Sequence, residues 1–148
     1  MRFYGFGNYY LSSLQQGLQS AHVVGELFTI YDGKSSQHKT VYDWGKNHKT
    51  MVLLNGGNSA SLQELFNLFK KLESEGMHLP FAKFNEDEQS LGGALTYVGI
   101  VVPEKYYSAA ATIRSLNSSE SISFLNDQKF KEWEIELVCE LNNYRLAS

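Results

Sequence analysis

Residues 2–31 have the sequence RFYGFGNYYLSSLQQGLQSAHVVGELFTIY, which predicts a strand followed directly by a helix. Arg2 to Gly7 favours a short strand, and Ser12 or Ser13 can cap a helix that runs to about Tyr31. We expect the inward side of this helix to consist of apolar and small residues, namely Leu14, Leu18, Ala21, Gly25 and Phe28, with Gly17 beside them. The small residues indicate that the helix can lie close to a sheet.

The rest of the chain continues this alternation. Further strands are predicted over 50–54, 79–84 and 95–102, and helices over 61–76, 106–116 and 127–146. Ser61 and Glu64 have the spacing of a capping box, and residues 117–120 form a polar link. The order predicts an α/β fold, a three-layer-like sandwich around a small mixed four-stranded sheet, with an added C-terminal helix. We expect one domain over 1–148, with a core over 1–116 and a helical extension over 117–148.

Composition narrows the class of protein. The chain has 148 residues, 43% of them hydrophobic, which suits one compact core. It has no apolar run of about 18 residues, so we expect a cytoplasmic protein without a membrane partner. A lone cysteine excludes an internal disulfide, and no residue spacing suggests a metal site; neither metal nor cofactor is expected. A net charge of −3 argues against coating of nucleic acid but allows a local basic face.

Gln19 and His22 lie three positions apart on the first predicted helix. This spacing puts an amide and an imidazole on one turn, near the carboxyl end of the opening strand, where open α/β sheets usually bind ligands. His22 is either part of such a site or a helix histidine satisfied by a backbone carbonyl.

A basic and aromatic stretch runs from Lys34 to Thr50. Its side chains suit phosphate binding and base stacking, and the candidate residues are Lys39, Lys46, Lys49 and Trp44. The alternative is a solvated loop whose tryptophan packs on the core. Both interpretations stay open at this point.

Taken in order, these segments resemble the type 2 peptidyl-tRNA hydrolase superfamily. The resemblance rests on four stretches between Phe3 and Tyr106: residues 12–22 with their QxxH, the tryptophan-led 44–54, residues 62–80, and the threonine-bearing 93–100. It implies a small α/β fold and an enzyme that cleaves the ester joining a peptide to tRNA.

The resemblance also implies a set of catalytic residues. It places His22 in the pocket as a base, Thr96 at the start of the fourth strand, and an acid on the loop after the third strand, where Glu86, Asp87 and Glu88 are available. Gln15 and Gln19 can supply neutral donors. The lysine of the family falls on Gln15, and this departure weakens the expected oxyanion stabilisation.

Two functions follow from these patterns. The first is a hydrolase-like protein acting on the acyl end of tRNA, with lysines gripping phosphates. The second is a catalytically degenerate member of the fold that serves as an interaction or inhibitory module, such as a phage accessory protein. Trp133 and Tyr144 on the C-terminal helix would then form the contact with a protein partner or an oligomer; otherwise that helix covers one face of the sheet.

Overall fold

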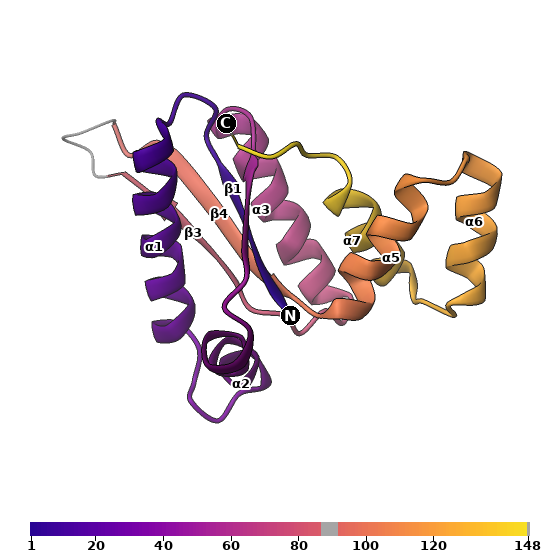
Figure 1. Cartoon of the computed structure of the whole chain (residues 1–148). Helices are drawn as coiled ribbons and strands as arrows, with labels where there is room; N and C mark the ends of the chain where they lie inside the picture. Colours follow the sequence, from indigo (N-terminus) through magenta and orange to yellow (C-terminus); the bar gives the residue numbers. More distant parts are fainter. Residues whose placement is uncertain (87–91, 148) are drawn as a thin grey trace.

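The computed structural model describes residues 1–86 and 92–147. Its elements follow in the order β1 (Arg2–Gly7), α1 (Ser13–Thr29), α2 (Ser36–Asp43), a π-helical turn η1 (Trp44–His48), β2 (Met51–Asn55), α3 (Ser59–Ser74), β3 (Phe81–Asn85), β4 (Leu95–Val102), α5 (Glu104–Arg114), α6 (Ser118–Asp127) and α7 (Glu132–Leu141). The predicted fold class, a mixed α/β fold around one four-stranded sheet, is confirmed (Figure 1).

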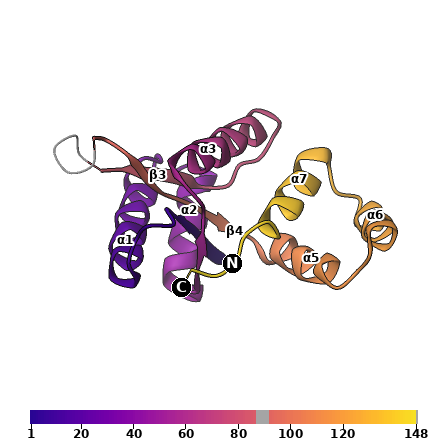
Figure 2. The same cartoon turned by 90° about the horizontal axis from the view of Figure 1, so that it is seen from above.

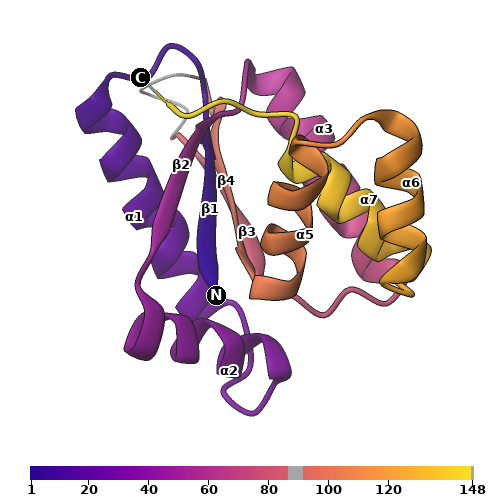
Figure 3. The ribbon, with the colours of Figure 1, turned by 45° about the vertical axis from the view of Figure 1, so that its right-hand side comes forward.

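The strands are ordered β2-β1-β4-β3. β1 pairs with β2 in parallel and with β4 antiparallel, and β3 pairs antiparallel with β4. Helices α1 and α2 lie on one side of the sheet, whereas α3, α5 and α7 lie on the other, with α6 outermost (Figures 2 and 3). The two sides are called the α1 face and the α3 face below.

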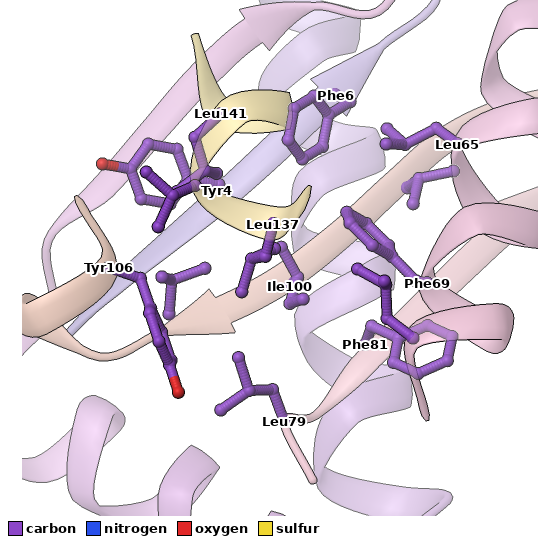
Figure 4. Packing of buried hydrophobic residues seen from close by; sticks show 14 of the residues in the cluster. Tyr4, Phe6, Leu65, Phe69, Leu79, Phe81, Ile100, Tyr106, Leu137 and Leu141 are labelled. Carbon is purple, nitrogen blue, oxygen red and sulfur yellow. The ribbon is translucent and has the colours of Figure 1, made fainter. Parts of the chain in front are cut away.

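Each face has its own hydrophobic cluster. The α3 face holds the larger one, in which Phe6, Phe69 and Ile100 are fully buried (Figure 4). The α1 face holds a smaller one around Phe3 and Tyr97. Because successive residues of a strand point to opposite faces, β4 can serve both clusters, and all eight of its residues are buried.

The predicted inward side of α1 is wrong. Leu14 and Leu18 are 75% and 54% exposed. The buried positions are instead Gln16, Gln19, Ser20, Val23 and Leu27, which also follow helical spacing. The helix thus has two sets of residues with helical spacing, and the more apolar set, which includes Leu14 and Leu18, faces away from the sheet.

Close packing of α1 comes from glycines in the strands rather than in the helix. A Cβ on Gly7 would overlap the side chain of Gln16, and one on Gly99 would lie 2.7 Å from Val23. Gly17 and Gly25 of the helix face open space. The helix therefore approaches the sheet because the sheet lacks side chains there.

Two helix starts test the capping predictions. Ser12 caps α1 and forms a capping box with Gln15, which confirms the expected start. The predicted box at Ser61 is wrong, because Asn58 caps α3 and its side chain accepts from the Ser61 N–H at 2.8 Å. Asparagine is as good a cap as serine and lies one turn earlier.

The C-terminal region differs most from expectation. Residues 117–120 are not a link, since Asn117 caps α6 in a capping box with Glu120. Of the helix predicted over 127–146, the structure has only α7. Lys129 has a φ of 57°, a left-handed conformation that breaks the helix and separates α6 from α7. Trp133 and Tyr144 pack against the cluster on the α3 face, so this region covers the sheet; its contact with a partner stays a prediction.

Both edges of the sheet are partly closed. The chain after α7 returns to β2, where the Asn55 N–H donates to Arg145 and the Ala147 N–H donates to Leu53. At the other edge, the Tyr31 hydroxyl bonds both the N–H and the carbonyl of Phe81, each at 2.8 Å. Among the helices described, none is long and apolar enough to cross a membrane.

Candidate functional site

The structure brings Gln19, His22 and Glu86 to one place on the α1 face. The Gln19 amide donates to the Glu86 carboxylate just beyond β3. His22, on the next turn of α1, is exposed and stacks on Phe84, with ring centroids 4.3 Å apart and an interplanar angle of 6°. An acid, an amide and an imidazole thus lie close together, but the acid is bonded to the amide.

Thr96 does not join this group. It is fully buried, and its hydroxyl donates to the Phe84 carbonyl at 3.4 Å. Thr96 lies on the central strand β4, whose residues are all buried. Phe84 pairs with Tyr97 and Asn85 pairs with Leu95, which leaves Thr96 as the extra residue of a bulge. The expected meeting of an imidazole and a hydroxyl at one open cleft therefore does not occur.

The other two catalytic candidates have different positions. Gln15 lies on the exposed first turn of α1, where its side chain accepts from the Ser12 N–H at 2.9 Å. Its amide is used in capping the helix. Glu88 and the neighbouring Asp87 lie outside the described residues.

Buried polar groups under α1 were missed in the sequence. Asn8 is fully buried, and its amide donates to Ser59 at 3.0 Å and to the Leu95 carbonyl at 3.4 Å. Gln16 is 5% exposed and donates to the Asn8 carbonyl at 3.3 Å. Side-chain oxygens of Asn8, Gln16 and Gln19 have no hydrogen-bond partner among the described residues. The buried residues of α1 follow helical spacing at positions 16, 19, 20, 23 and 27. Three of these five residues are polar, so a search for apolar periodicity does not identify them as the buried side of the helix.

A second candidate region is an open hollow of about 510 Å³ between α1, η1 and the start of β2. We call it the basic hollow; its lining residues are Val24, Phe28, Tyr42, Trp44, Gly45, Lys46, Lys49 and Met51. Most of its lining is apolar or aromatic, and two lysines, Lys46 and Lys49, also line it. Concave apolar sites with a few placed polar groups are the usual form of a ligand site.

The stretch for which a solvated loop was one of two open interpretations folds into helix, and this shapes the hollow. Ser35 caps α2 through the His38 N–H, and the chain then widens into η1. The Lys49 N–H donates to the Trp44 carbonyl at 2.8 Å, and Lys49 has a φ of 64°. Gly45 lets this turn approach α1, since a Cβ there would lie 3.1 Å from Phe28.

The aromatic residues of the hollow differ in their availability. Trp44 is 5% exposed, its indole N–H donates to the Thr50 carbonyl at 2.9 Å, and its ring lies 5.7 Å from that of Phe3. It forms a wall and is not a free stacking surface. Tyr42 is 56% exposed and has the Lys46 ammonium 5.9 Å from its ring centroid. Tyr42 is thus more exposed than Trp44 and than Phe28, which is 37% exposed.

Charge in this region is locally positive. Asp43 is the one acidic residue between Lys34 and Thr50, and it is engaged by His48 at 3.5 Å and by Asn47 at 2.6 Å. Lys46 and Lys49 form no ion pair with a carboxylate among residues 1–86 and 92–147. Lys39 is exposed on α2 and does not line the hollow. Three of the four residues predicted to bind substrate therefore meet at one place.

Within the described part of the chain, no group of three or more His, Cys, Asp or Glu side chains is arranged to hold a metal ion. No family model matches this chain, and no curated protein sequence matches it. The resemblance to the type 2 peptidyl-tRNA hydrolases stays a prediction from sequence.

Proposed function

We propose that the chain binds the acyl-bearing end of tRNA, or a similar single-stranded RNA end, in the basic hollow and does not hydrolyse it. The observation that carries this proposal is the grouping of two lysines without carboxylate partners beside an exposed tyrosine and an apolar wall. Lysines bind phosphates, and aromatic rings stack on bases of any sequence.

The lysines and the aromatic residues of the hollow have different roles in this proposal. Lys46 and Lys49 would hold neighbouring phosphates of the strand, while Tyr42 and Phe28 would contact the base or the acyl group. The protein has a net charge of −3, so binding to long duplexes over its whole surface is disfavoured. A short, local contact with a strand end suits this distribution.

Binding is tested by fluorescence anisotropy with a labelled single-stranded RNA of about ten nucleotides. The double variant Lys46→Gln/Lys49→Gln should bind about tenfold or more weakly and should lower the slope of log Kd against log salt by about 1.4, since each phosphate contact on a single strand contributes roughly 0.7. Tyr42→Ala should weaken binding without changing the salt slope.

A matched control separates the hollow from general charge. Lys70→Gln/Lys129→Gln removes the same charge at two exposed lysines of α3 and the α6–α7 connection. Equal weakening by the control and by the Lys46/Lys49 variant would contradict the proposal, as would the absence of RNA binding at low salt.

One observation favours a second candidate, ester hydrolysis at His22. The imidazole lies one helix turn from Gln19, which holds Glu86. A general base at neutral pH needs an orienting partner and a nearby oxyanion donor, and the Glu86 carboxylate is the described acid at this place. Its bond to Gln19 would have to be exchanged for one to His22.

The assay is release of tRNA from a peptidyl-tRNA. Under the binding proposal, the wild-type protein and His22→Ala both leave the ester intact while still binding RNA. Turnover by the wild type that His22→Ala abolishes would replace the binding proposal with the hydrolytic one.

A further inference from the structure

A second, more enclosed cavity lies on the opposite face of the sheet. It has a volume of about 250 Å³ and lies between β1, β2, α5, α7 and the chain that follows α7. We call it the arginine cavity; its lining includes Arg2, Tyr4, Tyr107, Arg114 and Tyr144. Tyr4 and a further lining residue, Leu141, both belong to the hydrophobic cluster on this face and are labelled in Figure 4.

Both guanidinium groups of the cavity are fixed in place. The Arg2 guanidinium carbon lies 4.1 Å from the ring centroid of Tyr107, a cation–π contact. Arg114 donates from Nε and Nη2 to the Asn142 Oδ1 at 3.2 and 2.8 Å. Asn142 is itself held by the Ala110 carbonyl, to which its amide donates at 2.9 Å.

Their positive charge has no ion-pair partner. Neither Arg2 nor Arg114 forms an ion pair with a carboxylate of the described residues. Glu140 accepts from the hydroxyl of Tyr144, a residue that lines the cavity, at 2.7 Å. A cavity lined by unpaired charges of one sign concentrates counter-ions, so these two guanidinium groups favour an anion over a neutral group.

We propose that the arginine cavity binds a small molecule with one anionic group and a flat apolar body. A carboxylate or a phosphate would lie between Arg2 and Arg114, because guanidinium groups present donors in a fork that matches both anions. The body would lie against the rings of Tyr4 and Tyr107. At about 30 Å³ for a water-sized group, the cavity holds on the order of ten non-hydrogen atoms.

Isothermal titration calorimetry with phenyl phosphate, benzoate and inorganic phosphate tests this site. At least one of the two aromatic anions should bind more tightly than inorganic phosphate, and comparing the two shows which anion the guanidinium pair prefers. Arg114→Gln should weaken the better ligand about tenfold, the usual effect of losing a hydrogen bond between charged groups.

The controls keep the test decisive. Arg145→Gln removes an arginine that lies outside the cavity and should leave binding unchanged. Arg2→Gln should act like Arg114→Gln; if Arg2→Gln fails to fold by circular dichroism, the exposed Arg114 position decides alone. No binding of either aromatic anion to folded wild-type protein, or equal affinity in wild type and Arg114→Gln, would overturn the proposal.

This site is independent of the proposed RNA site. Lys46→Gln/Lys49→Gln lies on the α1 side and should leave the affinity for the aromatic anion unchanged. Loss of anion binding in that variant would mean that the probe binds the basic hollow, and it would overturn the assignment to the arginine cavity.

Discussion

The two faces of the sheet are built in different ways. On the α3 face, three helices cover a cluster of aliphatic and aromatic side chains in which Phe69 lies against both Phe6 and Phe81, with ring centroids 6.2 and 5.7 Å apart. On the α1 face, one long helix lies on strand glycines and buries Gln16 and Gln19. The difference indicates that the α3 face contributes most of the stability, whereas the α1 face keeps polar groups and an open hollow at its margin.

The largest expected effect tests this division directly. Leu72→Ala should destabilise the protein by about 4 kcal/mol, because a fully buried side chain in the larger cluster is lost and a cavity remains. Leu27→Ala, equally buried on the α1 face, should cost about 2 to 3 kcal/mol. Urea unfolding of both variants checks the order; a larger loss for Leu27→Ala would reverse the comparison.

The glycines of the sheet give the next effect. Gly99→Ala should destabilise by about 2 kcal/mol, since its new Cβ would lie 2.6 Å from Phe3 and 2.7 Å from Val23. Gly17→Ala, on the open side of α1, should instead stabilise by about 0.5 to 1 kcal/mol through helix propensity. Thermal unfolding of the pair measures both signs, and a stabilised Gly99→Ala would disprove the close approach.

A buried polar pair on the α3 face makes its stability depend on pH. The Tyr106 hydroxyl donates to the Glu134 carboxylate at 2.6 Å. Desolvation raises the pKa of Glu134, but the bonds from Tyr106 and Lys131 and the charges of Lys105 and Lys131 outweigh it and hold that pKa below its ordinary value. The folded state therefore gains stability above the ordinary carboxyl pKa, and this gain is lost as the pH falls through the lowered one.

Tyr106→Phe should accordingly cost about 1.5 kcal/mol at neutral pH and progressively less in acid. Urea unfolding at several pH values between neutrality and pH 3 measures this difference. A difference that stays constant over the whole range would show that Glu134 is not the group that Tyr106 stabilises.

The smallest effect concerns the edge of β3. Tyr31→Phe removes the hydroxyl that bonds the N–H and the carbonyl of Phe81 and should destabilise by about 1 kcal/mol. It also leaves those groups open to another strand, so self-association should rise in sedimentation velocity. Tyr42→Phe, at an exposed tyrosine of the basic hollow, is the matched control and should change neither property.

Periodicity and propensity were enough to predict the strands Arg2–Gly7 and Leu95–Val102, whose bounds are confirmed. They failed where two patterns competed. On α1, apolar periodicity predicted that Leu14 and Leu18 face the sheet. The structure buries the more polar side of the helix instead, where Gln16 packs against Gly7. Thr96 is buried because it lies on the central strand β4, and alternation alone predicts neither that burial nor the bulge at this residue.

The basic stretch shows the opposite outcome. Its charge and aromatic content predicted a binding region, and Lys46, Lys49 and Trp44 do line one hollow. Composition and charge do not predict that α2 and η1 form there, because a π-helical turn has no sequence signature comparable to a capping box. Tyr42, rather than Trp44, is consequently the exposed ring.

The most direct test of the proposed function is an amide NMR titration of the wild-type protein with a short single-stranded RNA. The account predicts that the shifted resonances cluster at residues 42–51 and at Val24 to Phe28, around the basic hollow. Shifts confined to His22, Phe84 and Glu86 or to the C-terminal helices, or no shifts at saturating RNA and low salt, would contradict it.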